Sequence, residues 1–317
     1  MKIVYDGQKD TRQFKNMIGE TIEKIMQADD KVVWLDADLM GCSGTAKQLG
    51  KNNRYIDCGI AEANMVGIGC GMSAVGLKPY AHSFGPFASR RCYDQAFLSG
   101  GYAGNAITII GTDPGITAAF NGGTHMPFED VALYRAMPGA VIVDITDVPM
   151  LENILWQAKD LPGVKYIRVP RKDSYQVYEE GTEFKVGKGN VLREGTDAVI
   201  VASGIMVHEA MQAAEKLEKE GISAAVIDPF TIKPLDEELI RSYVEKTGAV
   251  VVAENHNRIG GLTSAVEETI VGMSCGFGYV AVEDVFGEVG PQSYLRERFD
   301  LTDDHIVREV KQVVKQA

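Results

Sequence analysis

The order of apolar segments along the chain is the feature that most restricts its fold. Short, continuous apolar runs alternate with segments of helical periodicity, beginning with a helix at residues 11–28 and a strand at residues 31–39. Such runs are typical of parallel strands that are buried on both faces, with helices as the crossovers between them. We therefore predict an α/β protein of two doubly wound domains, the first built on a parallel sheet and the second smaller.

The pattern is interrupted once, and the interruption divides the chain. Residues 172–190 lose the periodicity and gain charge and glycine, which marks a linker that crosses over to a second domain. We predict domains at residues 1–171 and 191–317. Further strands are expected at residues 78–84, 106–112, 140–145, 164–169, 197–203, 223–229, 249–255 and 279–285. Further helices are expected from Glu62 and at residues 89–99, 129–137, 148–158, 206–220, 236–245, 261–272 and 303–315.

Composition excludes several classes of protein. The 317 residues suffice for two ordinary domains, and 45% apolar with 24% charged residues is typical of globular proteins. A net charge of -12 argues against nucleic-acid binding, which needs a basic surface. The five cysteines form no CxxC pair, so we expect a reducing cytoplasm rather than disulfides or a zinc site. No segment has the length and apolarity of a signal peptide or of a membrane helix, so we expect no membrane.

The turn at residues 57–67 carries the most informative single carboxylate. Its sequence, DCGIAEANMVG, places Glu62 at the start of a helix that continues with Gly67, Gly69 and Gly71. Glycine costs a helix about 1 kcal/mol per residue, so we expect these positions to pack closely against another backbone. On the residues alone, Glu62 is either a surface carboxylate stabilised by the helix dipole or a buried acid with a chemical role.

Four stretches together resemble the pyrimidine-binding domain of the transketolase superfamily of thiamine diphosphate enzymes. They are GIAEANMVGIGCGMSAVGLKPYAHSF from Gly59, FASRRCYDQ from Phe87, NGGTHMPFEDVALYRAMPG from Asn121 and VIVDITD from Val141. The similarity runs from about Asp36 to Arg171 and resumes, with lower specificity, from Thr196 to Glu288, where it resembles the family's C-terminal domain. The whole chain resembles the C-terminal half of transketolase made as a separate subunit.

This resemblance implies which residues hold the cofactor. In the family, the Glu of a G-I-x-E motif hydrogen-bonds N1′ of the aminopyrimidine, and Glu62 stands at that place. That contact allows the 4′-amino group to take the C2 proton, so Glu62 is expected to be catalytic. Phe84 and Phe87 stand where aromatic side chains surround the ring, although such a pair also fills ordinary cores. Asp38 matches a segment near the cofactor, or else caps the turn after its strand.

The resemblance also implies substrate contacts. His125 matches the His of a G-x-T-H motif and is expected to hydrogen-bond the substrate's oxygen and to move a proton. Arg171 matches an Arg that contacts phosphate. Asn121 stands at the place of an Asp that contacts the donor's hydroxyl. Arg91 is expected either to reach a substrate anion or to pair with Asp94.

Three residues depart from the family's pattern. Arg90 occupies a position where transketolases commonly have Tyr, and Asn121 replaces the Asp just mentioned. Asp113 aligns with a His that helps to hold the acceptor phosphate. It would repel the anion that Arg171 attracts unless it pairs with an Arg. A ketose with a different substituent, or an anion held elsewhere, is therefore an alternative to the usual sugar phosphate.

A missing motif points to a partner. The family holds a Mg²⁺ or Ca²⁺ ion on the cofactor's diphosphate with Gly-Asp-Gly and a later Asn, and this pair does not occur here. We expect an N-terminal transketolase subunit to supply that half. Two copies of each chain would form a heterotetramer, in which this chain self-dimerises through both domains. Because the chain starts at Met1 with its own helix, we expect a natural subunit rather than a fragment.

Three functional hypotheses follow. The leading one is the C-terminal subunit of a two-chain transketolase that moves a two-carbon ketol unit from a ketose to an aldose. The second is the β subunit of a 2-oxoacid dehydrogenase decarboxylase, although that group lacks the arrangement at Gly123 to Pro127. The third is a non-catalytic partner that uses the same dimer face.

Overall fold

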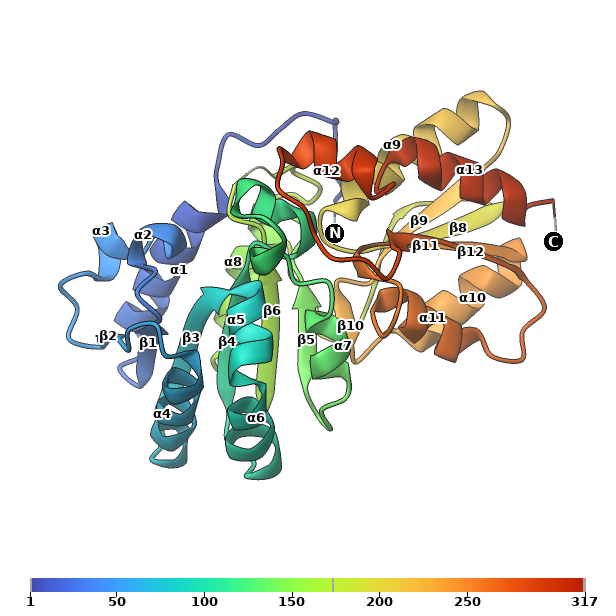
Figure 1. Ribbon diagram of the computed structural model, residues 1–317. Coiled ribbons are helices and arrows are strands. Elements are labelled where there is room, and N and C mark those ends of the chain that lie inside the picture. The colour runs from blue at the N-terminus through green and yellow to red at the C-terminus, as the bar shows by residue number, and fades with distance from the viewer. Residues whose placement is uncertain (1, 173, 316–317) are drawn as a thin grey trace.

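The computed structural model describes residues 2–172 and 174–315, so Met1, Asp173 and residues 316–317 of the predicted ranges lie outside the described residues. Two α/β lobes lie side by side, each around its own sheet (Figure 1). The expected α/β class is confirmed. The larger sheet has the order β10-β5-β6-β4-β3-β1-β2 and the smaller one has the order β12-β11-β8-β9-β7.

The larger sheet is parallel except for one edge strand. Its strands are β1 (Val32–Asp36), β2 (Tyr55–Asp57), β3 (Lys78–Phe84), β4 (Ile107–Thr112), β5 (Val141–Asp144), β6 (Val164–Val169) and β10 (Thr231–Lys233). Side chains in β1, β4 and β6 are buried along the whole strand, as their unbroken apolar runs predicted. β10 pairs antiparallel with β5.

Helices cover both faces of the larger sheet. They are α1 (Phe14–Ala28), α2 (Met40–Ser43), α3 (Ala46–Leu49), α4 (Glu62–Ala74), α5 (Gly85–Ser89), α6 (Tyr93–Gln95), α7 (Asp130–Arg135) and α8 (Val148–Ala158). α1 buries Phe14, Ile18 and Ile22 and packs on α8, in agreement with its three-and-four spacing. α8 begins at a cap in which the Asp147 side chain accepts a hydrogen bond from Met150 N.

The smaller sheet is also covered on both faces. Its strands are β7 (Asn190–Arg193), β8 (Ala198–Ala202), β9 (Ala224–Asp228), β11 (Ala249–Asn257) and β12 (Gly276–Val282). Its helices are α9 (Met206–Lys219), α10 (Glu237–Thr247), α11 (Leu262–Ile270), α12 (Gln292–Arg298) and α13 (Asp303–Val313). α9 and α13 lie on one face, and α10 and α11 lie on the other (Figure 1). Within the described ranges, no helix has the length and apolarity needed to cross a bilayer.

Two expectations about the elements are wrong, and a third finds no support in the described part of the chain. The helix expected at residues 89–99 is broken into short turns that end in a π-helix at Ala96–Tyr102. The last strand begins at Gly276 rather than at residue 279, because two glycines in the strand, which pack under α13, hide the strand pattern. Close packing of α4 on another backbone is not found within the described chain. Gly69 contacts side chains, and Gly67 and Gly71 have no atom within 4 Å of an added Cβ.

The two lobes are joined by a strand and by a buried ion-pair network. β10 belongs to the smaller lobe by its place in the sequence, but it pairs with β5 and forms an edge strand of the larger sheet. Arg168, 1% exposed, donates to Asp130 and Asp144 of the larger lobe and to the backbone oxygen of Asn255 in the smaller lobe, each at 2.9 Å. Such a network holds the lobes in one arrangement, because each buried charge depends on its partners.

Candidate active site

The carboxyl ends of the parallel strands in the larger sheet gather the predicted site residues. Phe84 is the last residue of β3, Asp113 follows β4, and Arg171 lies two residues beyond β6. Glu62 begins α4 after the turn from β2. The strand order reverses between β1 and β3, and ligands in open α/β sheets bind at such a point.

Glu62 is a buried, fully paired carboxylate. It is 1% exposed although it lies in the first turn of a helix. Ser83 Oγ donates to its Oε1 at 2.7 Å, and Arg91 Nη1 donates to its Oε2 at 2.9 Å. The alternative that Glu62 is a surface carboxylate is therefore wrong. The alternative that Arg91 pairs with Asp94 is also wrong, since its guanidinium is held by Glu62.

Three rings form a wall beside this carboxylate. The His125 ring lies 5.5 Å from that of Phe84 and 5.1 Å from that of Phe87, edge to face in both pairs. The two Phe rings are 6.4 Å apart. Arg91 lies over the Phe87 ring at 3.9 Å, which links the ring wall to the partner of Glu62. The sequence-predicted residues Glu62, Phe84, Phe87, Arg91 and His125 thus form one cluster.

Arg171 and Asp113 form an ion pair at the edge of the cluster. Arg171 Nη2 lies 2.5 Å from Asp113 Oδ2, and the same guanidinium lies 5.0 Å from the centre of the Phe84 ring. Burial raises the pKa of Asp113, and the adjacent Arg171 opposes that rise. Asp113 is thus paired with Arg171, and its negative charge offsets much of the positive charge that Arg171 would otherwise offer to a ligand.

Three other predicted residues lie outside this cluster. Asp38 is exposed at the end of β1, where its N–H donates to Asp57 Oδ1 at 3.0 Å. The turn after β1 is capped by Asp36, whose Oδ1 accepts from Leu39 N. Asn121 is exposed at the end of a 3-10 turn. Arg90 pairs with Glu129 at 2.7 Å and so supplies no aromatic contact.

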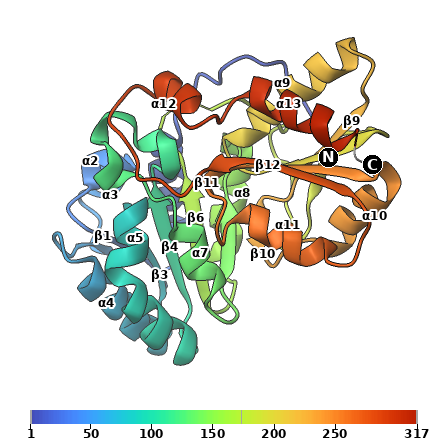
Figure 2. The ribbon, with the colours of Figure 1, turned by 45° about the vertical axis from the view of Figure 1, so that its right-hand side comes forward.

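The loop that carries His125 is held from the smaller lobe. Asn255 Oδ1 accepts from Ile116 N at 3.0 Å, and Asn255 Nδ2 donates to Pro114 O at 2.9 Å. Gly115 has a φ of +52° and passes so close that an added Cβ would lie 2.1 Å from Asn255 Oδ1. The segment between β12 and α12 also crosses over the larger lobe, where Gly287 packs on Gly123 (Figure 2).

Sequence reasoning missed two of these supporting residues. Ser83 precedes Phe84 on β3 and holds Glu62, and Asn255 lies near the carboxyl end of β11. Position at a strand's carboxyl end was the available signal for both. The reach of Asn255 into the other lobe depends on the packing of the lobes, which no local pattern indicates.

The cluster suits a flat heterocycle better than a diphosphate. It offers an apolar ring wall and a carboxylate whose oxygens keep lone pairs beyond those used by Ser83 and Arg91, and these suit the face and the polar edge of an aminopyrimidine. Its cations, by contrast, are already paired with carboxylates. Within residues 2–172 and 174–315, no cluster of three or more His, Cys, Asp or Glu could hold a metal ion.

Comparison with known families covers nearly the whole chain. Residues 10–176 match the pyrimidine binding domain of transketolase, and residues 187–306 match the C-terminal domain of transketolase. The chain is 46% identical over 293 residues to a 6-deoxy-6-sulfo-D-fructose transketolase subunit of Clostridium sp. (strain MSTE9), covering 91% of this chain and 90% of that one.

Two further proteins also match most of the chain, at lower identity. One of them, a subunit of the apulose-4-phosphate transketolase of Phocaeicola vulgatus, is 34% identical, over 79% of this chain and 81% of the relative. Among solved structures, a split gene transketolase in an inactive beta4 tetramer superposes with a TM-score of 0.88 at 35% identity, covering 96% of this chain and 99% of that one. The resemblance inferred from the motifs is confirmed.

Proposed function

The chain belongs to the transketolase family, in which it carries the pyrimidine-binding and C-terminal domains, and from this premise we propose that it is the C-terminal subunit of a two-chain transketolase. The complex transfers a two-carbon ketol unit from a ketose to an aldose with thiamine diphosphate. The observation that carries the proposal is the buried Glu62 carboxylate beside the rings of Phe84, Phe87 and His125.

Thiamine diphosphate supplies the electron sink for breaking and making the carbon–carbon bond. With the cofactor bound, Glu62 would hydrogen-bond N1′ of the aminopyrimidine, and Ser83 holds the carboxylate in place for that contact. Phe84 and Phe87 would pack on the ring and exclude water from it. His125 hydrogen-bonds the substrate's oxygen and moves a proton there, and Thr124 Oγ1 contacts its Nδ1 at 2.9 Å.

Asp38 and Asn121 are assigned lesser roles, at the border of the site. Asp38 lies two residues beyond β1, the strand next to β3 in the sheet, where it would border the cofactor. Asn121, on the loop that carries His125, faces the donor sugar. Both side chains are exposed in the isolated chain, so we expect them to make these contacts only when the partner subunit has completed the site.

We infer that the ketose donor ends in a sulfonate rather than in a phosphate. Arg171 keeps only part of its positive charge for a ligand, because Asp113 lies 2.5 Å away. A phosphate monoester carries about 1.5 to 2 negative charges at neutral pH, whereas a sulfonate carries one, so Asp113 repels a phosphate more strongly. The relative named for 6-deoxy-6-sulfo-D-fructose, at 46% identity, supports the same choice.

The site needs a second polypeptide. Because Arg171 and Arg91 are already paired with carboxylates, we infer that a partner chain holds the diphosphate and its Mg²⁺ or Ca²⁺ ion. We propose that this partner is an N-terminal transketolase subunit and that the complex is a heterotetramer.

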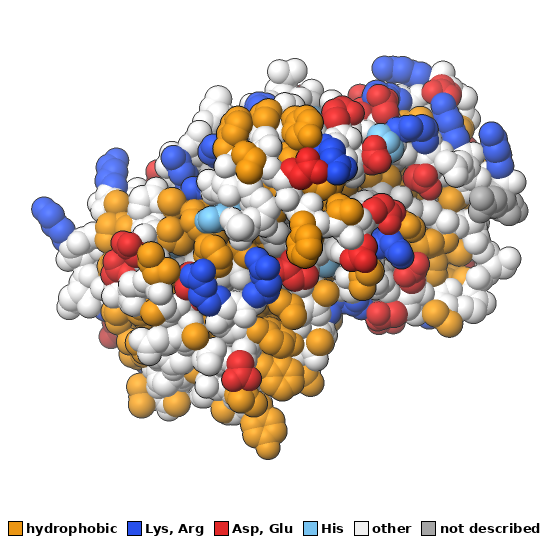
Figure 3. All heavy atoms as spheres, viewed as in Figure 1, with side chains coloured by type: hydrophobic (Ala, Val, Ile, Leu, Met, Phe, Trp, Pro, Cys, Tyr) orange, Lys and Arg blue, Asp and Glu red, His pale blue; other side chains and the backbone are white. Residues whose placement is uncertain are grey.

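Self-dimerisation of this chain involves α4. Gly67 and Gly71 leave open space along this helix, and exposed apolar side chains gather on the same lobe, over α4 and α6 (Figure 3). The large ones include Ile60, Val75, Leu98 and Tyr102. An apolar surface of this kind is typical of an interface.

The test is reconstitution. The chain alone should bind thiamine diphosphate weakly or not at all by titration calorimetry. Mixed with an N-terminal transketolase subunit, it should transfer a ketol unit from 6-deoxy-6-sulfo-D-fructose to an aldose. Tight stoichiometric cofactor binding by the chain alone would refute the divided site. A reconstituted complex that binds the cofactor without turnover would support the non-catalytic alternative.

A further inference from the structure

In the isolated chain, the Arg91 guanidinium makes two contacts that the proposed function assigns to the cofactor's aminopyrimidine. Its Nη1 donates to Glu62 Oε2 at 2.9 Å, and the centre of the guanidinium lies 3.9 Å from the centre of the Phe87 ring. A guanidinium is flat, carries N–H donors at its edge and stacks on aromatic rings, as an aminopyrimidine does. Arg91 thus covers a surface that the aminopyrimidine needs.

The two partners of Glu62 differ in how easily each can be exchanged. Ser83 is buried within β3, and its Oγ donates to Glu62 Oε1 at 2.7 Å. The Arg91 side chain is 42% exposed and starts from a short 3-10 turn, Arg90–Cys92. An ion pair that reaches water contributes little, because water screens its charges. Arg91 can therefore leave at small cost, provided that another donor takes its place at the buried carboxylate.

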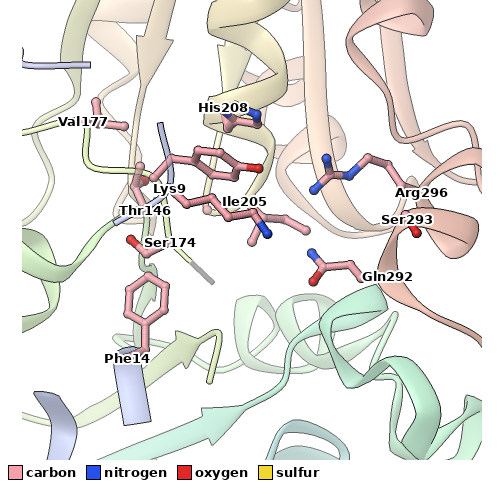
Figure 4. Close-up of a pocket in the computed structure, with 12 residues that line it drawn as sticks. Lys9, Phe14, Thr146, Ser174, Val177, Ile205, His208, Gln292, Ser293 and Arg296 are labelled. Atoms are coloured by element: carbon pink, nitrogen blue, oxygen red, sulfur yellow. The ribbon is translucent and has the colours of Figure 1, made fainter. Parts of the chain in front are cut away.

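A released Arg91 side chain would turn outward rather than into the interior. The hollow of about 340 Å³ between the lobes is lined by residues that include Thr146, Ser174 and His208 (Figure 4). None of its described lining residues belongs to the cluster around Glu62. On the cluster itself, the ring of His125 lies 5.1 Å from that of Phe87. A guanidinium that turns about Phe87 thus stays near His125, which we propose to hold the donor's oxygen.

Release would also provide the donor's anionic group with a cation. Arg171 pairs with Asp113 at 2.5 Å, and Arg90 pairs with Glu129 at 2.7 Å. Arg91 differs from both, because its carboxylate partner is the one that the aminopyrimidine would take. Its positive charge becomes available at the step at which the cofactor binds.

We propose that Arg91 holds the place of the aminopyrimidine in the cofactor-free chain and, once released from Glu62, binds the anionic group of the donor. The donor's anion contact then forms only after the cofactor is bound, so the two ligands are coupled. Such coupling is reciprocal, because each ligand must change the affinity of the other by the same factor. This inference rests on the proposed function and adds an order of binding to it.

The test uses titration calorimetry on the reconstituted complex at constant ionic strength. The ligands are thiamine diphosphate with Mg²⁺ and 6-deoxy-6-sulfo-D-glucitol, a donor analogue that lacks the carbonyl group and cannot react. Saturation with cofactor should tighten binding of the analogue by at least about fivefold. Arg91→Ala should bind the cofactor about three- to tenfold more tightly than the unsubstituted complex. In this variant, the cofactor should no longer tighten binding of the analogue.

Two further variants separate this role from a general effect of charge. Arg90→Ala removes the same charge one residue away and should keep both the cofactor affinity and the coupling. Arg91→Lys keeps the charge but lacks the flat fork that stacks on Phe87, so it should show a smaller gain in cofactor affinity with the coupling retained. It replaces Arg91→Ala if that variant fails to assemble by size-exclusion chromatography.

Three results would overturn the inference. They are equal or weaker cofactor binding by an assembled Arg91→Ala complex, unchanged coupling in that complex, and the same changes in Arg90→Ala. Failure of the transketolase assignment is a different result, since the unsubstituted complex would then neither bind the cofactor nor transfer a ketol unit.

Discussion

Arg91 donates from Nη1 to Oε2 of Glu62 across 2.9 Å, with its guanidinium stacked on Phe87. A carboxylate that is 1% exposed requires such a partner, because an unpaired buried charge costs several kcal/mol. The bonds from Ser83 and Arg91 hold the Glu62 side chain in one orientation in the isolated chain. The arrangement also links the ring wall and the carboxylate, so the side chains proposed to contact the cofactor are already arranged in the isolated chain.

The role of Glu62 can be tested without changing the size of its side chain. Glu62→Gln in the reconstituted complex should lower kcat by about 10²-fold or more, because the positioned proton exchange with N1′ is lost. Assembly should be unchanged by size-exclusion chromatography, since an amide can still accept from Ser83. Unchanged steady-state rates would remove Glu62 from the mechanism.

Asp113 should control the choice of substrate anion. Asp113→Asn removes the carboxylate that pairs with Arg171, so the guanidinium becomes available to a phosphate. We expect the ratio of kcat/KM for fructose 6-phosphate to that for 6-deoxy-6-sulfo-D-fructose to rise by about tenfold, which corresponds to about 1.4 kcal/mol. Arg90→Gln, which breaks an ion pair with Glu129, is the control and should leave the ratio unchanged. An equal effect of both variants would contradict the assignment.

Gly115 should be needed for the loop that carries His125. Gly115→Ala places a Cβ 2.1 Å from Asn255 Oδ1 at a φ of +52°, so we expect a loss of about 1–3 kcal/mol in unfolding free energy and a lower kcat. Gly139→Ala is the matched control, because Gly139 has a φ of +70° and no atom within 4 Å. Urea unfolding of both variants separates the contact with Asn255 from backbone strain. Equal losses would mean that Asn255 does not hold the loop.

The open side of α4 should mediate self-association. Gly71 is exposed and an added Cβ there has no atom within 4 Å, and leucine favours a helix more than glycine does, so we expect Gly71→Leu to retain or stabilise the isolated fold. The larger side chain should nevertheless weaken self-association in sedimentation velocity experiments. Gly41→Leu, also without atoms within 4 Å, is the control. A Gly71→Leu chain with unchanged association would place the interface elsewhere.

Stability should fall between about pH 4 and pH 7 because of a buried acid between the lobes. Burial raises the pKa of Asp228 from 3.8 to about 7, although it accepts from Thr146, Tyr178 and Phe230. Over that interval the folded state binds more protons than the unfolded state, so stability is lost as pH rises, by up to about 4 kcal/mol.

The matched variant is Asp228→Asn, which should flatten this pH dependence in urea unfolding measured from pH 4 to pH 8. A smaller pH dependence of the same sign should remain, because burial also raises the pKa of Asp147, to about 6. A pH profile that is unchanged by Asp228→Asn would refute the assignment.

Much of the fold was predictable because its strands are unbroken apolar runs. β4 and β6 are buried at every position, and such runs leave little choice but a parallel sheet. β10 was not predicted, because three residues whose partner lies 88 to 91 positions away carry no local periodicity. The boundaries of the two predicted domains remain predictions.

For the site, the motif residues Glu62, Phe84, Phe87 and His125 come together as expected. A motif gives the positions of residues along the chain, but which side chains form hydrogen bonds with one another depends on the directions in which they point. The pairing of Arg91 with Glu62 instead of Asp94, and the clamp from Asn255, therefore required the three-dimensional arrangement.

β10 has a wider consequence. Because this short strand of one lobe completes the sheet of the other, a protease that cuts the connecting segment at residues 174–189 would leave two pieces still fastened together through Thr231–Lys233 and the guanidinium of Arg168. The lobes are thus halves of a single cooperative folding unit, and neither half is expected to melt without the other.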